Sequence, residues 1–481
     1  MSVLVIDVGT SSLRAAIVKP DATVSHVHQQ RLPPSTPFPG LVEFDATEMA
    51  DAVLAAARAT LAEAGPVDGV GITNQRASTV LWDRATGIPL APAIGWQDLR
   101  TVFDCLTLAG DHGIRLAPNQ SATKLAALLN AHDPDRSRDL CFGTVDTWLA
   151  WTLSDGRLHV TDPSNAAVTG LLDHLDLQWS DHVLETLRIP RSCLPTIVDS
   201  SGAIGEASAL DGAPPIAALV GDQQGSLIGQ SCVRPGLTKI TFGTGGMLDT
   251  CTGSAAPESG QRNPHGTFPI VAWSIGGELT WGAEAIMLSA GTNVEWLVDD
   301  LGILNDAAES HAVASACADT GGVVYVPALL GLGTPRWDFG ARGTLLGLTR
   351  GTGRPELVRA VLEGVAQRGA DLVEAAEADS GLAIEVLRVD GGMSANPTFV
   401  QAVADAAQRV VEIAPVTEAT TLGAGFLAGL ATGLWGGMDD VAAAWRPRAT
   451  VEPGPALDRQ RWAEAVERAS GWMPDLSALD F

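Results

Sequence analysis

The chain has 481 residues and a formal net charge of −26, with 30 basic and 56 acidic side chains. So acidic a protein is a poor candidate for non-specific binding to nucleic acid or to an anionic membrane surface. Its length predicts two or three domains, and a hydrophobic share of 46% is enough to build substantial cores.

The chain begins with a run of apolar residues. Residues 3–8 (VLVIDV) predict a buried strand, and after a turn of small residues 13–18 return as a second strand. This start is therefore a hairpin and not a strand-to-helix phosphate loop. The next expected elements are a helix over 46–64 and short buried strands over 66–73 and 80–83. Alternating strands and helices of this kind predict an α/β architecture.

A similar rhythm begins again near the middle of the chain. Residues 237–242 predict a strand that enters a glycine-rich turn, and 247–251 return as a second strand. The pattern of strand, small-residue turn and strand thus occurs twice, which indicates two related α/β halves facing each other across a cleft. Two unrelated hairpins would give the same pattern. The other elements expected in this half are strands over 216–220 and 385–389 and helices over 397–410 and 455–474.

The cysteines, the first residues and one long uncharged stretch bear on where in the cell the protein is located. The six cysteines are far apart, and none forms a C-x-x-C pair or a zinc-type cluster with histidine, which favours reduced thiols in the cytoplasm. The first residues, MSVLVIDVGT, carry no cationic region before the apolar run, so we expect no signal peptide. Residues 420–438 approach membrane-spanning length, but their glycine and threonine content favours a buried, tightly packed helix.

The turn after the first strand is a candidate phosphate site. Gly9 would let the backbone approach a phosphate closely, and the three hydroxyl residues after it offer further donors. Asp7, at the end of the strand, is placed to hold Mg²⁺ directly or through water. A polar hairpin turn capped by an aspartate would have the same sequence.

Two more glycine-rich turns follow predicted strands. The turn 243–246 (GTGG) offers open backbone N–H groups and one hydroxyl. Gly391 and Gly392 would let a flat base or ribose lie against the chain, with Asn396 supplying an amide. Ordinary turn geometry explains each of them alone, but three such turns in this order are far more specific.

With these turns in place, the sequence resembles the FGGY carbohydrate kinases, which belong to the actin-like ATPase superfamily. The resemblance covers nearly the whole chain, and GITNQR, TDPSNA and the DGG…N motif are similar to the glycerol kinase branch. It implies two ribonuclease-H-like domains with ATP and Mg²⁺ bound in the cleft between them. We expect the N-terminal domain to span residues 1–230 and the C-terminal domain residues 231–481.

The resemblance also implies a role for individual residues. Asp222, in GDQQ, stands where the family has its general base, and such a carboxylate can orient the acceptor hydroxyl and accept its proton. Asp7 is implied at the metal, and Glu295 stands where the branch has a glutamine. The implied nucleotide contacts are Thr10, Ser11, Ser12, Arg14, Thr244, Gly291, Glu295, Gly392 and Asn396.

The acceptor pocket departs from the glycerol kinase pattern. The residues at its matching positions are Arg76, Ala77, Trp96, Asn119, Asp222 and Gln223. Ala77 replaces an acidic residue that holds the polyol, and Asn119 replaces a tyrosine. Loss of a charged acceptor for a hydroxyl costs about 1.5–3 kcal/mol, enough to change substrate preference. Asp98 and Arg100 resemble the W-N-D-x-R segment of kinases for five-carbon ketoses.

The sequence therefore predicts an ATP- and Mg²⁺-dependent kinase for a primary hydroxyl of a small polyol or sugar other than, or besides, glycerol. The alternatives are a kinase for a tetritol, pentitol or pentulose, a degenerate ATP-binding sensor, and a non-catalytic actin-like protein. Its expected partners are the small-molecule acceptor and ATP or ADP, with neither nucleic acid nor membrane. We expect a cytoplasmic protein and leave open whether it forms a homo-oligomer.

Overall fold

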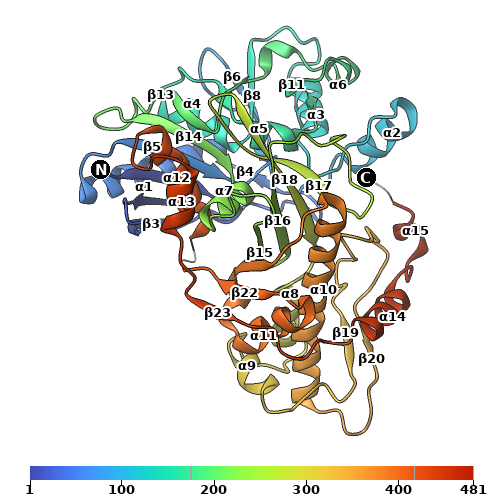
Figure 1. Ribbon diagram of the computed structural model, residues 1–481. Coiled ribbons are helices and arrows are strands. Elements are labelled where there is room, and N and C mark those ends of the chain that lie inside the picture. The colour runs from blue at the N-terminus through green and yellow to red at the C-terminus, as the bar shows by residue number, and fades with distance from the viewer. Residues whose placement is uncertain (174–175, 416–417, 480–481) are drawn as a thin grey trace.

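The computed structural model describes residues 1–173, 176–415 and 418–479 (Figure 1). Across these residues the largest sheet has 13 strands in the order β23-β22-β21-β15-β16-β18-β17-β13-β14-β5-β1-β2-β3. Its N-terminal strands are β1 (Val3–Val8), β2 (Ser12–Val18), β3 (Val24–Arg31), β5 (Gly69–Asn74), β13 (Ser201–Glu206) and β14 (Pro215–Gly221). Its C-terminal strands are β15 (Thr238–Phe242), β16 (Gly246–Gly253), β17 (Phe268–Ile275), β18 (Glu278–Met287), β21 (Val386–Asp390), β22 (Val410–Ile413) and β23 (Ala449–Val451).

The sheet contains the same five-strand unit twice. In the first unit β3, β2 and β1 are antiparallel neighbours, and β5 and β14 continue parallel to β1. In the second unit β18, β16 and β15 are antiparallel neighbours, and β21 and β22 continue parallel to β15. β13 and β17 join the units through one pair, Ser201 with Ile275. The prediction of two related α/β halves, made from their two hairpins, is confirmed.

Most predicted helices and strands are present with small shifts at their ends. α1 (Ala46–Ala64) has the predicted bounds, because the Asp45 carboxylate caps its first turn and Gly65 ends it. The helix predicted over 397–410 was too long. α11 (Pro397–Ala407) stops where Gln408 takes a left-handed φ of 51°, and β22 starts at Val410. The last predicted helix, 455–474, is the shorter α14 (Arg459–Ala469), followed by α15 (Pro474–Ser477).

Two helices from distant parts of the chain pack together at glycines. α7 (Asp222–Gly229) follows β14, while α12 (Ala419–Ala431) lies against β1, β5 and β14, so a segment near the C-terminus lies among N-terminal strands (Figure 1). A Cβ on Gly423 would lie 1.8 Å from the carbonyl oxygen of Gly225. The buried, glycine-packed helix predicted from residue 420 is thus confirmed, although it ends at Ala431. Within residues 1–173, 176–415 and 418–479, every helix is too short or too polar to cross a membrane.

Candidate active site

The first predicted phosphate turn connects β1 to β2. The Gly9 N–H donates to the Ser12 carbonyl oxygen at 2.9 Å, which closes the turn and leaves Ser11 exposed. The Trp96 indole N–H donates to the Thr10 hydroxyl at 3.0 Å. The structure therefore joins Trp96, one of the predicted acceptor-pocket residues, directly to the first predicted phosphate turn.

Asp7 lies at the carboxyl end of β1, just before that turn. Its carboxylate accepts a hydrogen bond from the Thr421 hydroxyl at 2.8 Å and lies 3.7 Å from Arg14 Nη1. Burial raises the pKa of Asp7 to about 6, while Thr421 and Arg14 oppose the rise and the charge of Asp222 adds to it. One carboxylate beside a phosphate turn fits Mg²⁺, which proteins bind through one or two carboxylates together with substrate phosphates.

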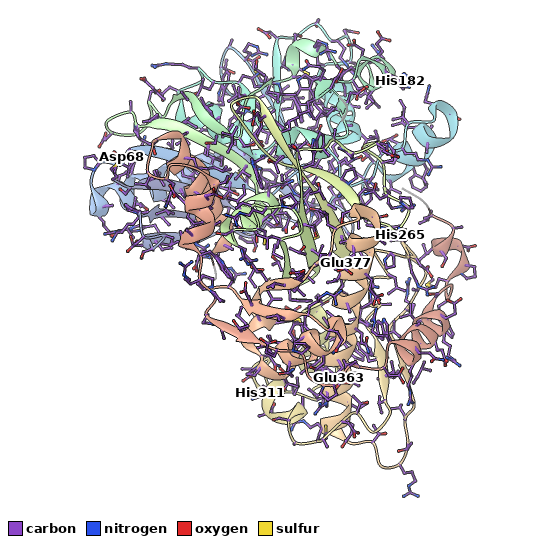
Figure 2. The ribbon with its side chains drawn as sticks, viewed as in Figure 1. Asp68, His182, His265, His311, Glu363 and Glu377 are labelled. Carbon is purple, nitrogen blue, oxygen red and sulfur yellow. The ribbon has the colours of Figure 1, made fainter. Side chains whose placement is uncertain are left out.

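The structure offers no competing metal centre among the residues it describes. Within them no group of three or more histidine, cysteine, aspartate or glutamate side chains could hold a metal ion. Figure 2 shows His182 in the upper part of the molecule and His311 in the lower part, on separate elements.

The second phosphate turn, between β15 and β16, is supported by the start of α8 (Thr292–Glu295). The Ala290 N–H donates to the Thr244 carbonyl oxygen and the Gly291 N–H to that of Gly243, both at 2.8 Å. A Cβ on Gly291 would lie 2.6 Å from the Gly243 carbonyl oxygen, so this approach requires glycine. Thr244 and Glu295 are both exposed. The structure thus brings Gly291 to the turn that carries Thr244, and the Glu295 N–H donates to the Gly291 carbonyl oxygen one helical turn further along.

The third turn packs on the second. Gly391 has a φ of 85°, and a Cβ there would lie 2.4 Å from the Phe242 carbonyl oxygen. Gly392 is exposed. The Asn396 side chain accepts from the Phe399 N–H at 3.1 Å and donates to the Ser310 hydroxyl at 2.9 Å. The predicted role of Asn396 toward adenosine therefore rests on its place beside Gly392, because its amide already caps α11.

Asp222, the predicted general base, is the first residue of α7. Its Oδ1 lies 3.4 Å from Arg76 Nε and accepts a hydrogen bond from the Gln223 N–H at 2.8 Å. The side chain is 30% exposed, so an acceptor can reach it. Burial raises the pKa of Asp222, and the positive charge of Arg76 opposes that rise. The result is a weakly solvated carboxylate that is suited to accept a proton from a hydroxyl.

Two charged residues that the sequence analysis did not single out contact this centre. Glu284, on β18, accepts a hydrogen bond from Arg76 Nη2 at 2.6 Å. Lys239, on β15, donates to Gln223 Oε1 at 2.8 Å. The sequence held a signal for Lys239, because lysines are rare in this chain, but it held none for the contacts that either residue makes.

Trp96 and Asn119, two other predicted acceptor residues, lie beside a second buried lysine. Lys124 Nζ donates to the carbonyl oxygens of Gly95 at 2.8 Å, Trp96 at 2.9 Å and Asn119 at 3.4 Å, so it ties together the two segments that carry Trp96 and Asn119. Ala77 is buried with a left-handed φ of 62°, whereas Asn119 is exposed.

Asp98 does not offer a free carboxylate to a ligand. It is fully buried, accepts from the Val42 N–H at 2.6 Å and binds the Arg100 guanidinium through both oxygens at 2.8 Å. Although its sequence segment resembles that of kinases for five-carbon ketoses, the Asp98 side chain has a structural role here.

A cavity of about 550 Å³ lies beside α14, in the second half of the chain. It is lined by Val324, Leu346, Asp458, Gln460, Arg461, Glu464, Ala465 and Arg468. None of the predicted site residues belongs to it.

Two family models match the chain. The N-terminal domain of the FGGY family of carbohydrate kinases matches residues 2–229, and the C-terminal domain of that family matches residues 238–432. The chain belongs to the FGGY family of carbohydrate kinases. The predicted enzyme class is confirmed, since this is an ATP- and Mg²⁺-dependent carbohydrate kinase.

Individual relatives agree with the family. The glycerol kinase of Aromatoleum aromaticum is 42% identical over 98% of this chain and 99% of its own length. That of Bordetella parapertussis is 43% identical over 98% of this chain and 97% of its own. The crystal structure of Plasmodium falciparum glycerol kinase with ADP has a TM-score of 0.90 at 29% identity, covering 97% of this chain and 98% of its own.

A more distant neighbour shows the fold alone. The ligand-bound xylulose kinase of Lactobacillus acidophilus has a TM-score of 0.83 at 20% identity, covering 97% of this chain and 96% of its own. The predicted fold class of two ribonuclease-H-like domains is confirmed. The domain boundary at residue 230 and the roles of individual residues stay predictions.

Proposed function

We propose that this kinase transfers the γ-phosphoryl group of ATP to a primary hydroxyl of glycerol and of somewhat larger polyols, with Asp222 as the general base. The observation that carries the proposal is the position of Asp222 at the start of α7. Its carboxylate is part-exposed, lies 3.4 Å from Arg76 Nε and is fixed by the Gln223 N–H.

The geometry suits the chemistry of phosphoryl transfer. The acceptor hydroxyl would donate a hydrogen bond to Asp222 and lose its proton to that carboxylate as the new O–P bond forms. In a loose transition state this proton becomes acidic late, so the base needs correct placement more than a high pKa. Mg²⁺ carried with the nucleotide would neutralise phosphate charge, and Asp7 is the residue that we propose to hold it.

Arg76 is suited to bind a second hydroxyl of the acceptor. Its side chain is 11% exposed, and Nη1 is buried without a hydrogen-bond partner among the residues that the structure describes. An unpartnered buried donor is costly, so a substrate oxygen at this atom would be well bound. Trp96, held by its indole bond to Thr10, would pack against the acceptor carbons.

Two features bear on the identity of the acceptor. The relatives with 42–43% identity are glycerol kinases, which supports glycerol itself. Ala77 supplies no carboxylate, and Asn119 is exposed, which supports a looser preference among polyols. The full engagement of Asp98 with Val42 and Arg100 favours polyols over ketoses.

An acceptor panel tests the proposal. ADP release would be measured with glycerol, erythritol, ribitol and xylulose as acceptors. We expect turnover with glycerol and with at least one longer polyol at a kcat/KM within about tenfold, which is about 1.4 kcal/mol. Exclusive use of glycerol would contradict the relaxed preference. ATP binding without turnover of any acceptor would favour a degenerate sensor.

We also propose a cytoplasmic location, which the cysteines support. All six are free, and five of them are buried. Buried, unpaired thiols are typical of a reducing compartment.

The oligomeric state can be measured by light scattering, and a single species of monomer mass would leave no role for a homo-oligomer.

A further inference from the structure

Three charged side chains lie side by side within the second half of the sheet. Lys239 on β15 pairs with Asp249 on β16, and Asp249 pairs with Glu284 on β18. Residues paired across antiparallel strands place their side chains on the same face. The side chains of Lys239 and Asp249 are 0% exposed, and that of Glu284 is 8% exposed. Burial of three charges in a row is costly, and an apolar row would be at least as stable.

Lys239 reaches from this row to the acceptor residues. Its Nζ lies 2.7 Å from Asp249 Oδ2 and donates to Gln223 Oε1 at 2.8 Å and to the Thr241 hydroxyl at 3.1 Å. An ammonium group can only donate, so Gln223 must present its carbonyl oxygen to Lys239. The NH₂ group of Gln223 is then left as a donor for an acceptor hydroxyl. Without Lys239 the amide could rotate and present either end.

Glu284 acts in the same way on Arg76. It accepts from Nη2 at 2.6 Å, while Nε stays 3.4 Å from Asp222 and both hydrogens of Nη1 stay unpaired among the described residues. Without Glu284 the guanidinium could turn to form a two-point ion pair with Asp222. Such a pair would occupy the carboxylate that the reaction needs.

We propose that Lys239 and Glu284 are positioning residues of the acceptor pocket: Lys239 fixes the amide orientation of Gln223, and Glu284 holds Nη2 of Arg76 so that the guanidinium contacts Asp222 through Nε alone. Both come from the second half of the sheet and act on residues of the first half and of α7. The inference rests on the proposed function, because it assigns these roles to that same pocket.

The competing explanation for Lys239 is that it only neutralises Asp249. A comparison of Lys239→Met with the double variant Lys239→Met/Asp249→Leu separates the two explanations. Replacement of a whole buried ion pair by apolar residues is often neutral for folding, so the double variant keeps the experiment informative if the single variant fails to fold. The readouts are KM for glycerol, KM for ATP and kcat.

We expect both Lys239 variants to raise the glycerol KM about tenfold or more, with the ATP KM changed less than about twofold. In a Gln223→Ala background, Lys239→Met should add less than about twofold, because the interaction through which it acts is gone. Recovery of the wild-type glycerol KM in the double variant would overturn the role of Lys239. A full additional effect in the Gln223→Ala background would overturn it as well.

Glu412 is a matched control for Glu284, because it lies in the same line of paired residues across the sheet, on the other side of Lys239. Glu412 on β22 pairs with Arg388 on β21 at 3.2 Å, and Arg388 is the strand neighbour of Lys239, but neither belongs to the predicted acceptor pocket. Glu284→Gln should lower kcat/KM for glycerol about tenfold, and Glu412→Gln should change it less than about twofold. Equal effects of both substitutions would overturn the role of Glu284.

The wild-type protein separates failure of this inference from failure of the proposed function. If the wild type turns over no polyol, the proposed function fails and the inference with it. If the wild type turns over glycerol and the Lys239 and Glu284 variants keep its kinetic constants, the inference alone fails.

Discussion

The hairpins β1–β2 and β15–β16 occupy the same place in the two five-strand units. One residue pair at the equivalent position across each hairpin differs in chemistry. Val5 precedes Thr10, in the first turn, by the same number of residues as Lys239 precedes Thr244, in the second turn. Val5 pairs with Ala16, whereas Lys239 pairs with Asp249. One topology therefore carries an apolar pair in one half and a buried ion pair in the other.

The helices α12 and α7, which pack on each other, also differ in what they contact. The apolar, glycine-rich α12 packs on β1, β5 and β14, whereas α7, which starts with Asp222 and Gln223, contacts β16 and β17 as well as β14. Both helices pack through apolar side chains, because Leu227 and Ile228 of α7 lie in the same apolar cluster as Phe426 of α12. The two helices differ at the start of α7, where Asp222 and Gln223 contact Arg76 and Lys239 and where we propose that the acceptor binds.

Substitution at the start of α7 should have the largest effect on activity. Asp222→Asn removes the proposed base with little change in shape, so turnover should fall about 10²–10⁴-fold while ATP binding persists. Steady-state kinetics and equilibrium ATP titration measure the two quantities. Asp439→Asn, at an exposed surface pair with Arg234, is the control and should leave both unchanged. Near-normal turnover of Asp222→Asn would exclude this residue as the base.

Substitution at the glycine contact of α12 should act on stability. A Cβ on Gly423 would meet the backbone of Gly225, so Gly423→Ala should lower the free energy of unfolding by about 3 kcal/mol. Gly110 lies exposed in α2 (Val102–His112) with open space around it, so Gly110→Ala should raise that free energy by about 0.5–1 kcal/mol. Urea unfolding followed by circular dichroism compares them. A stable Gly423→Ala protein would contradict the close packing of α7 and α12.

The sequence predicted best those features whose signal is local. The bounds of β1 and α1 follow from a short apolar run and from an aspartate cap with a closing glycine. The end of α11 was missed because the left-handed conformation of Gln408 has no local signal. Asp222 could be predicted as the base from the sequence because its motif is contiguous, and that role stays a prediction.

Glu284 and Lys239 were missed for a different physical reason. They reach Arg76 and Gln223 only through strand register and through the packing of one half on the other. Neither relation can be calculated from a single segment of the sequence. Such pairs become visible only when the strands are placed side by side.

Acceptor preference should change when the missing carboxylate is restored. Ala77→Glu returns an acidic side chain to the position after Arg76, where a charged acceptor for a hydroxyl is worth about 1.5–3 kcal/mol. We expect the ratio of kcat/KM for glycerol to that for erythritol to rise about tenfold. Ala77→Gln, which has the same size without the charge, should raise it much less. An unchanged ratio in both variants would remove residue 77 from the determinants of specificity.

The smallest expected effect is a shift in the pH profile of kcat/KM. Asp222 must be ionised to act as a base, so activity falls as the pH drops through its pKa, which burial raises above the ordinary 3.8. The negative charge of Glu284 also raises that pKa, while Arg76 lowers it. In Glu284→Gln the Asp222 pKa should therefore fall, and the acid limb should move to lower pH by less than about one unit. A shift to higher pH would mean that Glu284 stabilises the charge on Asp222, which would contradict the role proposed for Glu284 in limiting the contact of Arg76 with Asp222.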